Sequence, residues 1–95
     1  MTKLEELEAE FKRVMAESFP QYGVYVNDAP RAREFNCIWL DAPGGMLNVQ
    51  FVVPINTAES PDTDIIALAA RLAHIVDISF QNKIRGEDDV QPISG

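Results

Sequence analysis

Apolar side chains near the N-terminus recur at the three- and four-residue spacing of an amphipathic α-helix. The helix has signals at both ends: Thr2 and Glu5 match a capping box, and Pro20 prevents continuation of the helix. Charged residues fill most of the positions between the apolar ones, which are Leu4, Leu7, Phe11, Val14 and Met15. The pattern predicts a first helix that packs through one face.

Three strand-like stretches follow, at residues 22–27, 35–41 and 46–55. The first alternates between two faces and is followed by a predicted loop at residues 28–31. The second and third are rich in β-branched and aromatic residues and flank Ala42-Pro43-Gly44-Gly45, a strong turn signal. We therefore expect an antiparallel meander of three strands.

The turn chemistry predicts a register for the second hairpin. Proline cannot adopt the positive φ that both two-residue hairpin turns need at their first central residue. The alternative is a three-residue loop, with Pro43 and Gly44 in a type I turn and Gly45 left-handed. This loop pairs Ala42 with Met46, and then Trp39 with Val49, Cys37 with Phe51 and Phe35 with Val53.

The same register divides the side chains of the hairpin between two faces. Phe35 and Trp39, the aromatic stripe of the second strand, share a predicted core face with Leu47, Val49, Phe51 and Val53. The opposite face is mixed, because apolar side chains accompany polar ones there: Ile38, Leu40, Met46, Asn48, Gln50 and Val52. This outer face is more apolar than a solvated surface requires.

A second, longer helix is predicted between Ser60-Pro61-Asp62, which match an N-terminus, and Gly86, which matches a C-terminus. Its apolar residues cover an arc of roughly 180°, wider than the ~100° stripe that packs on one sheet. The predicted fold is α+β, in two layers, with both helices on one face of the meander. Residues 1–86 would form a single domain, and the acidic residues 87–95 a mobile tail.

Composition excludes several classes of protein. The 95 residues carry a net charge of −7, which disfavours nucleic acids and anionic membranes as partners. Cys37 is the only cysteine, so no intrachain disulfide can form. The N-terminus has no apolar signal segment. We therefore expect a cytoplasmic location.

The chain has few candidates for chemistry. His74 lies at helical spacing from Arg71 and Asp77, but it has no nucleophile nearby, and a solvated helix surface explains it. Cys37 is expected in the core. The residue spacings match no metal site, and we expect no cofactor and no enzymatic activity. Arg31 and Arg33 form a small basic patch that is expected to bind an anion, or a carboxylate or phosphate of a partner.

Excess apolar surface is the feature that remains, and it favours a non-enzymatic interaction or assembly module. The expected partners are a second copy of the chain, in a homodimer or a closed ring, and another protein. In element order the chain resembles small secretion chaperones and phage tail or connector assembly proteins, without a shared residue signature. Two alternatives stay open. One is a ligand-binding or catalytic protein with an intersubunit pocket near Arg31, Arg33 and His74. The other is an acidic mimic that inhibits another protein by blocking its basic site. The expected interface residues are Ile38, Leu40, Met46, Val52, Ile66 and Ile84.

Overall fold

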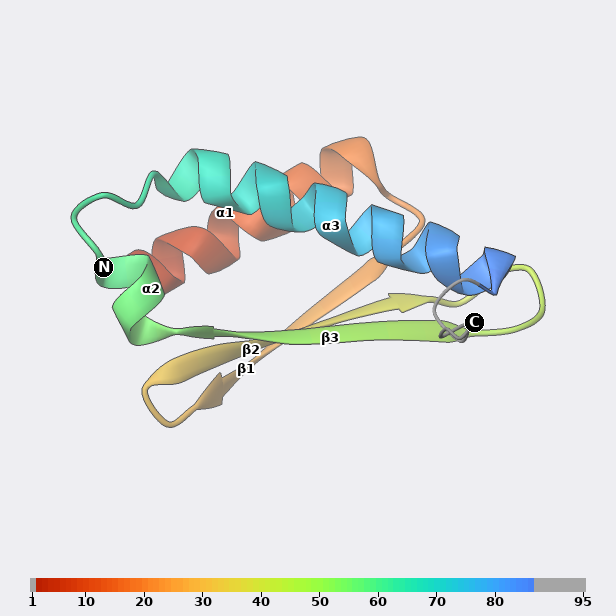
Figure 1. Ribbon diagram of the computed structural model, residues 1–95, viewed down its shortest axis with the longest axis horizontal. Helices are drawn as coiled ribbons and strands as arrows, with labels where there is room; N and C mark the ends of the chain where they lie inside the picture. Colours follow the sequence, from red (N-terminus) through yellow and green to blue (C-terminus); the bar gives the residue numbers. More distant parts are fainter. Residues whose placement is uncertain (1, 87–95) are drawn as a thin grey trace, which may run out of the picture.

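Three helices and three strands make up the computed structural model, which describes residues 2–86. The strands form one antiparallel sheet in the order β1-β2-β3, and α1 and α3 lie side by side on one of its faces (Figure 1). The predicted α+β meander with both helices on one face is confirmed. The predicted tail, residues 87–95, lies outside the described residues. The elements are α1 (Lys3–Ser18), β1 (Gly23–Ala29), β2 (Ala32–Trp39), β3 (Leu47–Pro54), α2 (Ile55–Glu59) and α3 (Ile65–Arg85).

The ends of the helices follow capping chemistry, with one correction. The capping box of α1 is present, because the Thr2 hydroxyl accepts from the Glu5 N–H and the Glu5 carboxylate accepts from the Thr2 N–H. Gly86 ends α3 in a left-handed conformation, as predicted. The predicted start of this helix at Ser60 was wrong: Asp64 is the N-cap, and its Oδ1 accepts from two backbone N–H groups.

The segment before α3 explains that error. The short helix α2, which the sequence pattern did not reveal, directly follows β3. Ser60 then begins a turn of its own, closed by the Thr63 N–H, which donates to the Ser60 carbonyl. The Thr63 hydroxyl donates to the Thr57 carbonyl at 2.7 Å and so ties this turn back to α2. Serine and proline signals of this kind suit turns as well as helix starts.

The second hairpin has its predicted faces but a different register. Trp39 pairs with Leu47, and the whole ladder is shifted by two residues from the predicted one. The loop is longer than expected, residues 40–46, and its turn is closed by the Gly45 N–H donating to the Ala42 carbonyl. Gly44 has φ 88° after Pro43, the type II pattern rather than type I. Because side chains alternate with period two, the shift leaves every face assignment unchanged.

The first hairpin is tighter than predicted. β1 extends to Ala29, which pairs with Ala32, so Pro30 and Arg31 alone form the turn where a loop of residues 28–31 was expected. Arg31 has φ 55°, a left-handed conformation that is uncommon for a residue other than glycine. Its carbonyl accepts a 2.8 Å hydrogen bond from the Ile55 N–H, which links this turn to the start of α2.

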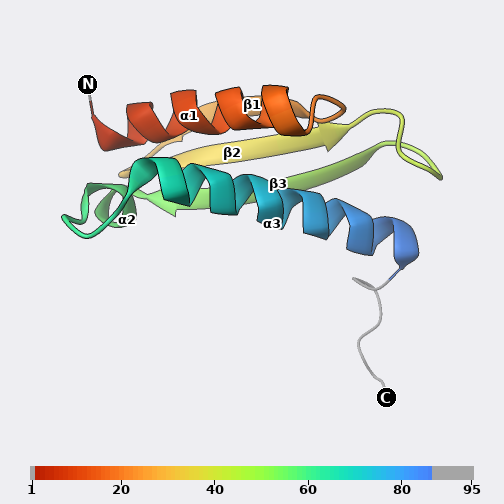
Figure 2. The ribbon, with the colours of Figure 1, turned by 90° about the horizontal axis from the view of Figure 1, so that it is seen from above.

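The core lies between the sheet and the two long helices, whose layers Figure 1 shows from the side and Figure 2 from above. Phe35, on the central strand, stacks on Phe51 at 5.0 Å between ring centroids and meets Phe11 of α1 edge-on at 5.2 Å. A second aromatic group joins Tyr22, Trp39 and Phe80 at the other end of the core. The predicted inward direction of the aromatic stripe is confirmed, although Trp39 is only partly buried.

Candidate functional site

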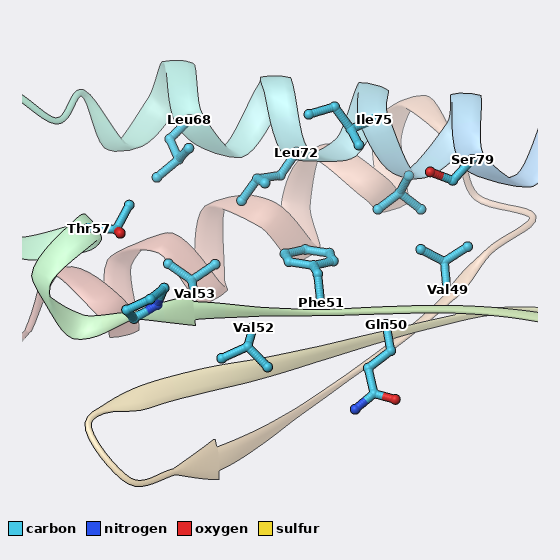
Figure 3. A pocket seen from close by; sticks show the side chains of 12 residues that line it. Val49, Gln50, Phe51, Val52, Val53, Thr57, Leu68, Leu72, Ile75 and Ser79 are labelled. Carbon is cyan, nitrogen blue, oxygen red and sulfur yellow. The ribbon is translucent and has the colours of Figure 1, made fainter.

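An apolar groove of about 430 Å³ runs between β3 and α3 (Figure 3). Two polar side chains, Thr57 and Ser79, stand among the hydrophobic ones on its walls, and the lining also includes Gln50 on β3. Most of the hydrophobic lining comes from alternate residues of β3 and from helically spaced residues of α3, and the edge of β3 adds Val52 and Pro54: the set is Val49, Phe51, Val52, Val53, Pro54, Leu68, Leu72, Ile75 and Val76. A groove of this kind binds apolar groups and offers little for polar chemistry.

The sequence positions both walls of the groove. Val49, Phe51 and Val53 point toward the helix layer because strand side chains alternate between faces. On α3, Leu68, Leu72 and Ile75 are spaced four and three residues apart and therefore share one face of the helix. The wide apolar arc of α3 explains this arrangement: one side of it enters the core, and the adjoining side lines the groove.

The groove continues into a smaller, polar hollow of about 290 Å³ at the start of α3. Thr57 and Leu68 line both spaces. Asp62, Asp64 and Arg71 line the hollow, so this end of the groove carries two carboxylates and one guanidinium. The Asp64 carboxylate is already engaged as the helix cap.

The six expected interface residues do not form one surface. Leu40 and Met46 lie in the β2–β3 loop and are 70% and 62% exposed, with half-buried Ile38 on the adjoining end of β2. Val52 is exposed near the other end of β3. Polar side chains of the outer face lie between these two places, namely Asn36, Asn48 and Gln50.

The two expected interface residues on α3 are also far apart. Ile66 is 65% exposed in the first turn of α3, and Ile84 is 36% exposed in the last. At 1.5 Å per residue, they lie about 27 Å apart along the helix. Ile75 and Ile78, also exposed, occupy the middle of α3. Ile75 belonged to the apolar arc seen in the sequence but was not identified as an interface residue.

Arg31 and Arg33 differ in their surroundings. Arg33 is largely buried beneath α1, where its Nη1 donates to Glu8 Oε1 at 2.5 Å. Its Nε lies 3.2 Å from Asp28 Oδ1, an ion-pair distance at an angle that makes no hydrogen bond. Arg31 is exposed in the hairpin turn. The structure therefore uses Arg33 to join α1 to the sheet, and it brings no described anion site together around the two arginines.

Glu8 is the acidic side of this contact. Its partial burial opposes ionisation, but hydrogen bonds from Lys12 and Arg33 outweigh that effect and hold the pKa of Glu8 below its usual range. Further along α1, Arg13 forms ion pairs with Glu10 and Glu17. Much of the acidic surface of α1 is thus neutralised by the chain's own basic residues.

The three helical residues around His74 do not assemble into a catalytic group. Asp77 accepts a 2.6 Å hydrogen bond from the Tyr22 hydroxyl, on the side of α3 that faces the core. Burial, followed by this hydrogen bond, raises the pKa of Tyr22 to about 12. His74 and Arg71 are exposed, and within residues 2–86 no hydrogen bond or ion pair connects either of them to Asp77.

Cys37 lies fully buried on the central strand, as expected from its position between two aromatic residues. Burial raises the pKa of its thiol to about 12, which suppresses the nucleophilic thiolate. In the part of the chain that the structure describes, no three histidine, cysteine, aspartate or glutamate side chains are close enough to hold a metal ion. None of the described helices is long and apolar enough to cross a membrane.

These features leave the groove, its polar end and the exposed apolar side chains as the candidate binding surfaces. Comparison of the chain with protein-family models, with curated proteins and with solved structures finds no match to any of them.

Proposed function

We propose that the chain is a non-enzymatic interaction or assembly module that associates with itself and holds a protein partner. One observation carries the proposal: large apolar side chains remain exposed although the core is complete. Within the described residues no polar or charged residue is fully buried, and the exposed apolar side chains lie outside the buried core. They are Tyr25, Leu40, Met46, Val52, Ile66, Ile75, Ile78 and Ile84. Where such side chains lie together in one patch, they mark association surfaces.

The loop end of the second hairpin and the flanks of α3 are the surfaces we assign to self-association. Leu40 and Met46 project from the loop, and Ile84 lies in the last turn of α3, at the same end of the molecule (Figure 1). A two-fold homodimer buries the same patch on both copies, and a closed ring buries two different patches of each copy, so either arrangement would cover these side chains. The cytoplasm is the compartment we propose, because the chain's only cysteine is buried and unpaired.

The polar groups support a binding role over a catalytic one. Arg33 is neutralised by Glu8 and Asp28, and Asp77 is held by Tyr22. A general base and a nucleophile must lie within hydrogen-bonding distance of one another. His74, the chain's single histidine, is on the outer side of α3, and Cys37, its single cysteine, is inside the core.

Light scattering at micromolar concentrations tests self-association. We expect the wild-type protein to be a dimer or a larger closed oligomer, and Leu40→Lys or Ile66→Glu to shift it toward monomer. Ala70→Glu is the matched control for Ile66→Glu, because it adds the same charge at an exposed position of the same helix without removing a large apolar side chain. A wild-type monomer at every concentration, or equal effects of Ile66→Glu and Ala70→Glu, would contradict the proposal.

A further inference from the structure

The outer edge of β3 has unpaired backbone groups beside the groove. β3 is the last strand of the sheet, and no described strand lies beyond it. The Ile55 N–H donates to the Arg31 carbonyl in the register of the β2–β3 ladder. Residues that hydrogen-bond to the neighbouring strand alternate along an antiparallel ladder with residues that do not. The backbone N–H and C=O groups of the odd-numbered residues of β3 therefore point toward β2. The N–H groups of Asn48, Gln50 and Val52 therefore point outward.

α3 covers the space next to this edge. Seen from the helix side, α3 crosses over β3, and its C-terminal half lies outside the edge of the sheet (Figure 2). The groove is the space under this overhang, with Leu72 and Ile75 on the helix side and Phe51 on the strand side (Figure 3). A fourth strand added beside β3 would therefore meet a row of backbone hydrogen-bonding groups along one side and an apolar cover, formed by α3, above it.

A second copy of the chain cannot fill this place with its own β3. Paired strands lie about 4.8 Å apart, whereas packed helices need about 8–10 Å between their axes. Because α3 already lies above the space beside β3, a two-fold axis through that space would bring the two α3 helices into the same volume. Self-association must therefore use other surfaces of the molecule.

A strand that followed α3 directly in the chain is also a poor occupant. It would run parallel to β3 after a helical crossover. In Figure 2 the helices face the viewer, β3 points to the left, and its free edge is the lower one. If the picture is turned so that β3 points upward, the added strand lies to the left of β3. That crossover is left-handed, whereas about 98% of such connections are right-handed.

We infer that the groove binds one extended segment of a partner protein, which adds to β3 as a fourth strand beneath α3. This inference rests on the proposed interaction function and names the partner's form. Strand addition of this kind uses backbone hydrogen bonds for affinity and side-chain pockets for selection. The outward N–H groups span residues 48–52, so about five residues of the partner segment pair with the edge.

The two sides of the added strand meet different surroundings. Alternate side chains of the segment enter the groove and are apolar, while the others lie beside Asn48 and Gln50 on the outer face and are polar. β3 itself carries no charge between Leu47 and Pro54, but the whole chain carries −7, and the hollow at one end of the groove has Asp62 and Asp64 against a single Arg71. The partner segment is therefore an alternating strand with basic flanks.

A synthetic peptide tests this inference. The probe alternates valine with threonine over six residues between two terminal lysines, and the control peptide has the same composition with its valines consecutive. Hydrogen exchange followed by NMR reports each backbone amide. We expect the probe at millimolar concentration to slow exchange at Asn48, Gln50 and Val52 by at least about tenfold, and the control peptide to do so far less.

Two matched pairs of variants separate the backbone from the groove. Gln50→Pro removes an outward N–H without touching the β2–β3 hydrogen bonds, and Gln50→Ala keeps that N–H. Ile75→Ser removes a wall of the groove, and Ile66→Ser removes an equally large exposed side chain outside it. We expect Gln50→Pro to bind the probe at least about tenfold more weakly than Gln50→Ala, and Ile75→Ser at least about tenfold more weakly than Ile66→Ser.

The outcomes also distinguish this inference from the proposed function. Absence of protection at the three amides, or equal protection by both peptides, overturns the strand-addition inference even if light scattering shows an oligomer. Equal binding by Ile75→Ser and Ile66→Ser overturns the role of the groove. Probe binding by a protein that stays monomeric would support strand addition and reject self-association.

Discussion

Replacing Phe35 with alanine tests the aromatic centre of the core. Phe35 is fully buried on the central strand, and its ring contacts Phe11 at 5.2 Å and Phe51 at 5.0 Å. Truncating a buried phenylalanine costs about 3–5 kcal/mol, which includes the cavity left between its neighbours. A chain of this length has a free energy of unfolding of roughly 5–14 kcal/mol. The variant should therefore lose about 15–30 °C in Tm.

Denaturant and thermal unfolding followed by circular dichroism measure this loss. Tyr25→Ala is the matched control, because Tyr25 is an aromatic residue on the neighbouring strand whose side chain is 59% exposed on the opposite face of the sheet. It should cost less than about 1 kcal/mol. If Tyr25→Ala destabilised the protein as much as Phe35→Ala, the assignment of the two sheet faces would be wrong.

Four further measurements address individual residues. Trp39, the only tryptophan, contacts the rings of Tyr22 and Phe80 and should emit at shorter wavelength in the folded than in the unfolded protein; emission typical of a water-exposed indole would contradict its inward position. Tyr22→Phe should cost about 1 kcal/mol. Because burial and Asp77 raise the pKa of Tyr22 from 10.0 to about 12, wild-type stability should fall as pH rises from 10 to 12, and denaturant titrations of the variant should lack that component. Cys37 should react with a thiol reagent at pH 8 far more slowly in the folded than in the unfolded protein, and equal rates would argue against its burial. Arg31→Gly should stabilise the protein by roughly 0.5–1 kcal/mol in denaturant titrations by relieving a left-handed φ of 55°, whereas a loss would show that the arginine side chain holds the turn.

The parts of the fold that depend on periodicity could be predicted from the sequence. Helical spacing and the capping box identified α1, and strand alternation placed Phe35 and Val53 on the core face. The hairpin register was wrong because it depended on loop length. Pro43-Gly44-Gly45 specify a turn but not the number of flanking residues that leave the ladder.

The candidate site was less accessible to sequence reasoning. The wide apolar arc of α3 indicated surplus surface, but the crossing of α3 over β3, which makes the groove, is a tertiary feature. Similarly, Arg33 looked available to a partner, because nothing in the local sequence places Glu8 above it. Contacts between residues distant in the chain decided both cases.

The overhang of α3 also bears on solubility. A strand edge without charge, such as that of β3, is the kind of surface through which proteins polymerise, and natural sheets commonly protect such edges with lysine, proline or bulges. Only Pro54, at the last position of β3, provides any of these. The C-terminal half of α3 protects this edge sterically instead. When two copies approach edge to edge, their α3 helices collide before the two β3 strands can pair. Fraying or proteolysis of α3 beyond Ala73 would remove that barrier and turn a selective binding edge into a template for aggregation.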